Sequence, residues 1–202
     1  MLEKDDSPPP RFVAGADVSY DRGSPILFAA VIVIDTESME VVETAGVRAR
    51  ASFPYVPGYL SFREIPPLLK AFSRLGHRPD LLICDGHGRA HPRRFGLACH
   101  LGVVLDLPSI GCAKSVLVGE YREPGPRRGA HTVLKHRSEV IGEALRTRAG
   151  VKPVFVSVGH RVSLATARRA VLRLAPRYRL TEPVRAAHQE VNRLRRQAAR
   201  RA

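Results

Sequence analysis

The stretch LLICDGHGRAHPRR, residues 81 to 94, joins four apolar residues directly to an acid and a glycine-rich loop. A short apolar run of this kind, bounded by Pro79-Asp80 and Gly86, is typical of a strand buried on both faces of a parallel sheet. Open α/β sheets bind their ligands at the carboxyl ends of such strands, which is where Asp85 stands. The stretch therefore predicts an α/β sheet with a functional site at this edge.

The residues before this strand predict an antiparallel meander and a helix. Residues 12–20 (FVAGADVSY), 26–35 (ILFAAVIVID) and 39–49 (MEVVETAGVRA) read as strands, and their short connections favour antiparallel pairing. Apolar spacing predicts a helix from Pro66 to Leu75. The order of three strands, a helix and a buried strand predicts a mixed central sheet.

The residues after residue 94 predict further helices and strands. Pro92 suits the first turn of a helix over residues 93–106, and Ser163 is a candidate N-cap for a helix over residues 163–175. The remaining expected elements are strands at 109–114, 116–121 and 154–158, a strand or helix at 140–145, and a helix at 183–196. We expect one domain over residues 11–192, a disordered lead-in over 1–10 and a basic tail over 193–202.

Composition points to a polyanionic partner. The 202 residues carry a formal net charge of +14, which favours nucleic acid, although a solvated basic surface is the alternative. Three cysteines in apolar surroundings, with no C-x-x-C spacing, indicate reduced core residues and no disulfide. No apolar run approaches the roughly 18 residues of a membrane span, so we expect a cytoplasmic protein without a membrane partner.

Two acids are candidates for a metal site. Asp17 lies within an otherwise apolar strand, where a carboxylate is costly unless it is paired, hydrogen-bonded or bound to metal. The order of the elements brings it beside Asp85. The repulsion between two adjacent carboxylates is commonly offset by a divalent cation such as Mg²⁺. The alternative for each acid is a turn or cap residue bonded to backbone N–H groups, which we favour for Asp35.

Five separated segments resemble one known family. FVAGADVSY, FPYVPGYLSFRE, ICDGHGRAHPRRFGLACHLG, SIGCAKS and VKPVFVSVGHRVSLATA occur in the order, and nearly the wording, of endonuclease V, the deoxyinosine 3′-endonuclease. The resemblance spans roughly residues 12 to 190. It implies an RNase H-like fold, with three antiparallel strands followed by parallel strands and helices on both faces of the sheet.

The resemblance also assigns catalytic roles. It makes Asp17 and Asp85 the Mg²⁺ ligands, with Mn²⁺ able to substitute, and Glu64 a third carboxylate. Lys114 matches the lysine of the family's active site, which would neutralise the scissile phosphate. His188 falls near the expected metal site, although a half-buried helical histidine is the alternative.

The same resemblance implies a substrate pocket. Tyr55 lies in PYVP, which is similar to the family's wedge motif, and its flanking prolines would stiffen the loop. Gly58, Gly86, His91 and Gly111 match the pocket that receives the flipped base. Two departures, SFREIPP and KHRSEVIG, do not change a proposed ligand.

The resemblance implies a DNA-repair activity. The expected reaction is Mg²⁺-dependent hydrolysis of the second phosphodiester bond 3′ to deoxyinosine, which leaves a 3′-hydroxyl and a 5′-phosphate. Two alternatives stay open at this point. One is a nuclease of the same fold that acts on inosine in RNA or on branched DNA, and the other is a non-catalytic nucleic-acid-binding module.

Overall fold

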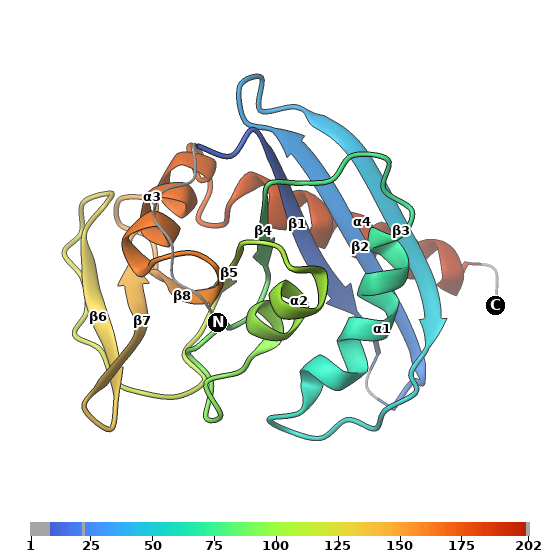
Figure 1. Cartoon of the computed structure of the whole chain (residues 1–202), viewed down its shortest axis with the longest axis horizontal. Coiled ribbons are helices and arrows are strands. Elements are labelled where there is room, and N and C mark those ends of the chain that lie inside the picture. Colours follow the sequence, from blue (N-terminus) through green and yellow to red (C-terminus); the bar gives the residue numbers. More distant parts are fainter. Residues whose placement is uncertain (1–8, 22, 201–202) are drawn as a thin grey trace.

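The fold of the computed structural model is built on one eight-stranded sheet in the order β3-β2-β1-β4-β5-β8-β7-β6 (Figure 1). The structure describes residues 9–21 and 23–200, so most of the expected lead-in, and the last two residues of the expected tail, lie outside it. The strands are β1 (Phe12–Ser19), β2 (Ile26–Asp35), β3 (Val41–Arg50), β4 (Leu81–Cys84), β5 (Ser109–Ala113), β6 (His131–His136), β7 (Glu139–Leu145) and β8 (Val154–His160). The helices are α1 (Leu60–Phe72), α2 (Leu97–Leu105), α3 (Leu164–Leu174) and α4 (Glu182–Ala199).

The pairing of the strands confirms the predicted mixed sheet. β1, β2 and β3 form the antiparallel meander, and β1, β4 and β5 are parallel neighbours. Beyond β5, the strands β8, β7 and β6 pair antiparallel and extend the sheet to its second edge. The LLIC run is β4, which is buried along its whole length between two parallel neighbours.

Helices cover both faces of the sheet. Side chains that alternate along the central strands form two apolar cores, one against α1 and α2 and the other against α3 and the start of α4. Figure 1 shows α1 and α2 in front of the sheet and α4 behind it. A Cβ at Gly15 of β1 would lie 2.1 Å from the backbone carbonyl carbon of Pro183, so this glycine lets α4 approach the strand closely.

Two helix starts differ from the prediction. α1 begins at Leu60, and Pro66 and Pro67 lie inside it, because burial of Ile65 and Leu68 against the sheet stabilises the helix despite the lost N–H groups. α2 begins at Leu97 and not at Pro92. The intervening residues form a turn in which Arg94 has a φ of 55°, a conformation that a helix does not allow.

The strand predicted at residues 116–121 is wrong. This segment forms only an isolated bridge between Glu120 and Lys135, and the neighbouring strand is β6, which was not predicted. In the β6–β7 turn, Arg137 and Ser138 have φ angles of 53° and 67°. Two-residue hairpin turns with positive φ angles usually contain Asn-Gly, so Arg-Ser did not indicate a hairpin in the sequence. Residues 140–145 belong to strand β7, which settles the open alternative.

Four further sequence expectations can be compared with the structure. Ser163 caps α3 by accepting a hydrogen bond from the backbone N–H of Thr166. α4 continues to Ala199, beyond the helix predicted at residues 183–196 and into the expected basic tail at 193–202. The three cysteines are buried free thiols. Among the described residues, no helix is both long and apolar enough to cross a membrane.

Candidate active site

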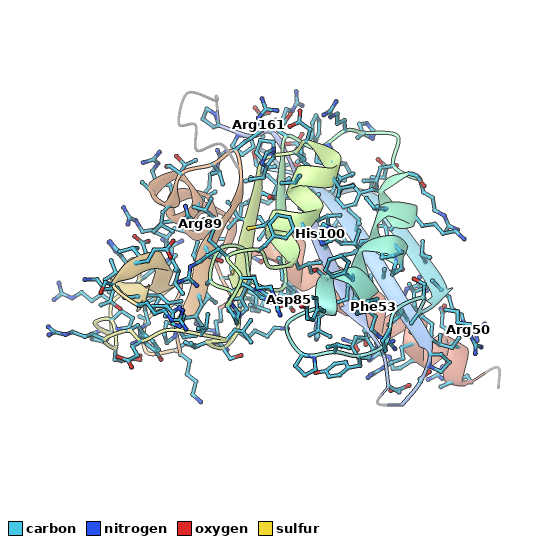
Figure 2. The ribbon with its side chains drawn as sticks, turned by 60° about the horizontal axis from the view of Figure 1, so that its bottom comes forward. Arg50, Phe53, Asp85, Arg89, His100 and Arg161 are labelled. Atoms are coloured by element: carbon cyan, nitrogen blue, oxygen red, sulfur yellow. The ribbon has the colours of Figure 1, made fainter. Side chains whose placement is uncertain are left out.

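A cavity of about 290 Å³ lies at the carboxyl ends of β1 and β4. Figure 2 views this face of the molecule, with Asp85 near its centre. The cavity brings together all five residues that the resemblance assigned to catalysis. Its lining consists of Asp17, Val18, Ser19, Glu64, Asp85, Leu97, Lys114 and His188.

The two aspartates meet because of the parallel register between β1 and β4. Ala16 pairs with Cys84, and the backbone N–H of Asp85 donates to the carbonyl of Ala16 at 3.0 Å. Asp17 and Asp85 each follow one member of that pair, so the register sets them side by side. The prediction from element order, that the end of the buried strand lies beside the first strand, is confirmed.

His188 reaches Asp17 from the opposite face through α4. Its Nδ1 lies 2.8 Å from Oδ2 of Asp17, and its Nε2 lies 3.1 Å from Nδ2 of Asn192. Nδ2 of Asn192 also donates to the carbonyl of His188 at 2.8 Å, which identifies this atom as the amide nitrogen. Nε2 of His188 is therefore the acceptor, and Nδ1–H donates to Asp17. This pair orients the carboxylate in the way that outer partners orient metal ligands.

Lys114 follows β5 and lies against the second aspartate. Its Nζ is 2.5 Å from Oδ2 of Asp85. The loop that carries Lys114 is held by Arg179, whose Nη2 donates to the carbonyls of Lys114 and Pro153. The lysine thus has a fixed backbone and a charge directed into the cavity.

Glu64 enters the cavity from α1, and its environment favours the protonated form. Burial, and then the charges of Asp17 and Asp85, raise the pKa of Glu64 to about 8. Burial and Asp85 also raise the pKa of Asp17 to about 6 despite the opposing effect of His188. A cavity in which nearby carboxylates disfavour the ionisation of Glu64 and Asp17 is suited to a bound cation.

The donor set fits a divalent cation that prefers oxygen. Oxygens of Asp17 and Asp85, together with a ring nitrogen of His188, lie within 4.8 Å of one another. Because both nitrogens of His188 already have partners, the carboxylates of Asp17 and Asp85, with Glu64 nearby, are the better candidates for the ligands. Such a set suits Mg²⁺ or Mn²⁺ better than zinc.

We expect the metal-free protein to lose stability as the pH rises from about 4.5 to 8. Unfolded Glu64 would titrate near its ordinary pKa of 4.5, whereas the folded protein keeps the proton up to about 8. Within that window the folded state binds more protons, so its free energy of unfolding falls with rising pH. Glu64→Gln removes this dependence and should raise the melting temperature at pH 8 but not at pH 4.5. Calorimetry in a chelator would measure it.

The control for this experiment is Glu37→Gln, which changes an exposed acid of the same type. Its melting temperature should follow that of the wild type at both pH values. A gain from Glu64→Gln of the same size at pH 4.5 and pH 8 would contradict the assignment, because it would reflect packing and not the buried charge.

Tyr55 and Gly58 belong to the loop between β3 and α1. Tyr55 is 59% exposed, and its ring makes an edge contact with Tyr20 at a centroid distance of 6.4 Å. Pro54 and Pro57 restrict the backbone on either side. Gly58 has a φ of +79°, which disfavours a side chain at the turn into α1.

The other expected pocket residues lie around the loop after β4, outside the lining of the acidic cavity. A Cβ at Gly86 would meet only the side chain of Leu97, at 3.7 Å, so the fold itself does not require glycine there. A Cβ at Gly111 would lie 2.4 Å from the backbone nitrogen of Gly88, so Gly111 lets this loop pack on β5. His91 is buried, and its Nδ1 accepts from the N–H of Arg93, which leaves the ring proton on Nε2.

Comparisons with known proteins agree on one family. The family model described as Endonuclease V matches residues 1–189. An Endonuclease V from Roseiflexus castenholzii is 58% identical over 179 residues, which cover 89% of this chain and 80% of that protein. The crystal structure of Endonuclease V from Streptomyces avermitilis superposes with a TM-score of 0.93 at 46% identity and covers 98% of this chain and 88% of that one.

Two more distant structures extend the likeness. Endonuclease V from Ciona intestinalis, in complex with a 23-mer DNA containing an inosine followed by a ribo-adenosine, has a TM-score of 0.82 at 28% identity. The match covers 94% of this chain and 87% of that chain. An Argonaute from A. aeolicus has a TM-score of 0.52 at 13% identity over 88% of this chain and 28% of its own, which shows the fold alone. The predicted RNase H-like fold is confirmed.

Proposed function

This chain belongs to the endonuclease V family, and we propose that it is a Mg²⁺-dependent endonuclease that recognises deoxyinosine in DNA. The proposed reaction is hydrolysis of the second phosphodiester bond on the 3′ side, which leaves a 3′-hydroxyl and a 5′-phosphate. The observation that carries it is the single cavity shared by Asp17, Glu64, Asp85 and Lys114. The relative that was crystallised with inosine-containing DNA supports the choice of substrate.

The chemistry follows from the placement of the charges. Asp17, Asp85 and Glu64 would hold the cation, which when bound supplies Lewis-acid stabilisation of charge on the phosphate. His188 keeps the carboxylate of Asp17 oriented toward the cavity. Lys114 carries a positive charge, and its ammonium group can exchange its contact with Asp85 for a contact with a phosphate oxygen as the substrate enters. Hydrolysis at this site needs no covalent protein intermediate.

The experiment that tests this proposal compares labelled duplexes that differ at one base. Purified protein should nick the duplex with a single inosine when Mg²⁺ or Mn²⁺ is present, and should leave it intact in a chelator. It should also leave the matched adenosine duplex intact under both conditions. Cleavage of both duplexes at similar rates would favour a nonspecific nuclease of the same fold.

Inosine in RNA remains the second candidate substrate. The observation that favours it is the ribo-adenosine that follows inosine in the DNA bound to the Ciona relative. Rates on matched inosine-containing DNA and RNA strands would separate the two activities.

The location of the protein in the cytoplasm also remains a prediction.

We expect Tyr55→Ala to weaken binding to an inosine duplex by about 1 to 3 kcal/mol, the scale of one base–aromatic stack. The ring is exposed in a proline-bounded loop, which supports the proposal that it fills the gap left by a flipped base. The loss should be smaller for a single strand, which requires less unstacking. Fluorescence anisotropy of labelled DNA would measure both affinities.

Tyr55→Phe is the matched control, because it keeps the ring and removes only the hydroxyl. It should bind both substrates as the wild type does. Equal losses for Tyr55→Ala on duplex and single strand would show that the ring serves folding or simple packing and not insertion.

A further inference from the structure

Two arginines hold the two halves of the loop that presents Tyr55. We call residues 51–59, between β3 and α1, the wedge loop, and residues 85–96, between β4 and α2, the aspartate loop. Arg63 of α1 donates from Nη1 to the carbonyl of Phe53 at 2.7 Å, near the beginning of the wedge loop. Figure 2 shows Phe53 and Asp85 on the same face of the molecule, where the two loops lie side by side.

Arg93 of the aspartate loop holds the other end of the wedge loop. Its guanidinium lies over the ring of Tyr59, with the central carbon 4.0 Å from the ring centroid. Its Nη2 lies 2.8 Å from the hydroxyl of Tyr59, and its Nη1 lies 3.3 Å from the carbonyl of Gly58. One side chain therefore makes a stacking contact and two hydrogen bonds with two consecutive residues.

The local backbone makes room for this contact. Gly58 has a positive φ that favours glycine, and a Cβ there would lie 3.0 Å from Nη1 of Arg93, so the guanidinium would have to shift slightly. On the other side, the backbone N–H of Arg93 donates to Nδ1 of His91. The contact thus runs from the aspartate loop, which begins at Asp85, to the turn that follows Tyr55.

We propose that Arg93 is a positioning residue that locks the wedge loop to the aspartate loop before the substrate binds. The inference rests on the proposed function, because it assigns Arg93 a part in inserting Tyr55 into a duplex. A ring that must displace a base pushes against the stacked duplex, and a loop that is ordered in advance pays less entropy on binding. The same contact keeps the wedge at a constant position relative to the cavity.

The alternative role for an exposed arginine in a protein of charge +14 is a contact with a DNA phosphate. The two roles differ in what they predict. A phosphate contact would be lost equally from duplex and single strand, and its loss would reduce the dependence of binding on salt. If Arg93 instead locks the wedge loop, its loss should impair activity mainly on duplex DNA, which must be opened, and should leave the salt dependence of DNA binding unchanged.

The test compares kcat/KM for inosine in duplex and in single-stranded DNA. Arg93→Ala should lower the duplex value about tenfold, the scale of one lost charged hydrogen bond, and the single-strand value by less than about twofold. Tyr59→Phe removes one hydrogen-bond partner and should give a partial loss on duplex alone. Arg93→Lys keeps the positive charge but loses the planar guanidinium with its two terminal nitrogens, so it should not restore kcat/KM for the duplex.

Arg74→Ala is the matched control, because this exposed arginine also donates to the carbonyl of a glycine, Gly46, at the far end of α1. It should leave both values unchanged. Equal losses on duplex and single strand for Arg93→Ala, with a shallower salt dependence, would identify a phosphate contact and overturn the inference. Restoration of the duplex value by Arg93→Lys would do the same.

A second readout does not depend on cleavage. The chain contains no tryptophan, so Tyr55→Trp introduces a single emission probe into the wedge loop. In the absence of DNA, fluorescence anisotropy of this probe should fall when Arg93→Ala is added and should not change with Arg74→Ala. An unchanged anisotropy in the Arg93→Ala background would show that the loop is not held by this contact. If the wild type does not cleave inosine-containing DNA at all, the proposed function fails. The anisotropy measurement still decides whether Arg93 holds the wedge loop in place.

Discussion

Asp85→Asn should reduce the rate of inosine cleavage by about 10³-fold or more while leaving DNA affinity close to that of the wild type. The substitution keeps the size of the side chain and removes the charge that the cation and Lys114 both need. No phosphate contact is removed, so binding measured in a chelator should change little. Single-turnover rates at saturating Mg²⁺, together with binding curves, would measure the two effects separately.

The control for this variant is Asp106→Asn. Asp106 lies at the end of α2, near the start of β5 and therefore at the opposite end of the parallel strands from Asp85, and its φ of 45° suits asparagine as well as aspartate. This control should cleave at the wild-type rate. An Asp85→Asn variant that keeps more than about a tenth of that rate would remove Asp85 from the metal site.

Lys114→Met should reduce the cleavage rate by about 10²-fold and should not weaken binding of the metal ion. Methionine keeps most of the length of lysine but carries no charge to offset the charge of the phosphate in the transition state. Nζ of Lys114 lies 2.5 Å from Asp85, so in the absence of metal the lysine competes with a cation for that carboxylate. Removing it should lower the Mg²⁺ concentration needed for half-maximal rate, in contrast to Asp85→Asn, which should raise it.

Lys70→Met is the matched control, because Lys70 is an exposed lysine in the last turn of α1. Its rate and its metal requirement should equal those of the wild type. If Lys114→Met needs more Mg²⁺ than the wild type, the lysine supports the metal site and does not compete with the metal.

The central part of the fold could be predicted because its signals are local. The LLIC run, the alternation in residues 12–35 and the acid at the end of β4 each follow from short segments, and the register of β1 and β4 then places Asp17 beside Asp85. The start of α1 could not be predicted, because Pro66 and Pro67 contradict local helix propensity and only burial against the sheet overrides it. β6 was missed because its edge position leaves four of its six residues polar.

The candidate site divides in the same way. Asp85 and Lys114 directly follow strands that the sequence marks, and Asp17 lies within one. The resemblance identified Glu64 and His188. Asn192, Arg179 and Arg93 were not identified, because each acts through a partner that is distant in the chain or acquires its role only through folding. For Asn192 a usable signal was present, since it follows His188 by four residues on one face of a helix.

The measurement that tests the account most directly is the position of the nick in a duplex that carries one inosine. Wild-type protein with Mg²⁺ should cut the inosine-containing strand at the second phosphodiester bond on the 3′ side, leaving a 3′-hydroxyl that a polymerase extends and a 5′-phosphate that a ligase accepts. The product should be absent with Asp85→Asn. Cleavage at a position unrelated to inosine, or an equal rate with Asp85→Asn, would contradict the account.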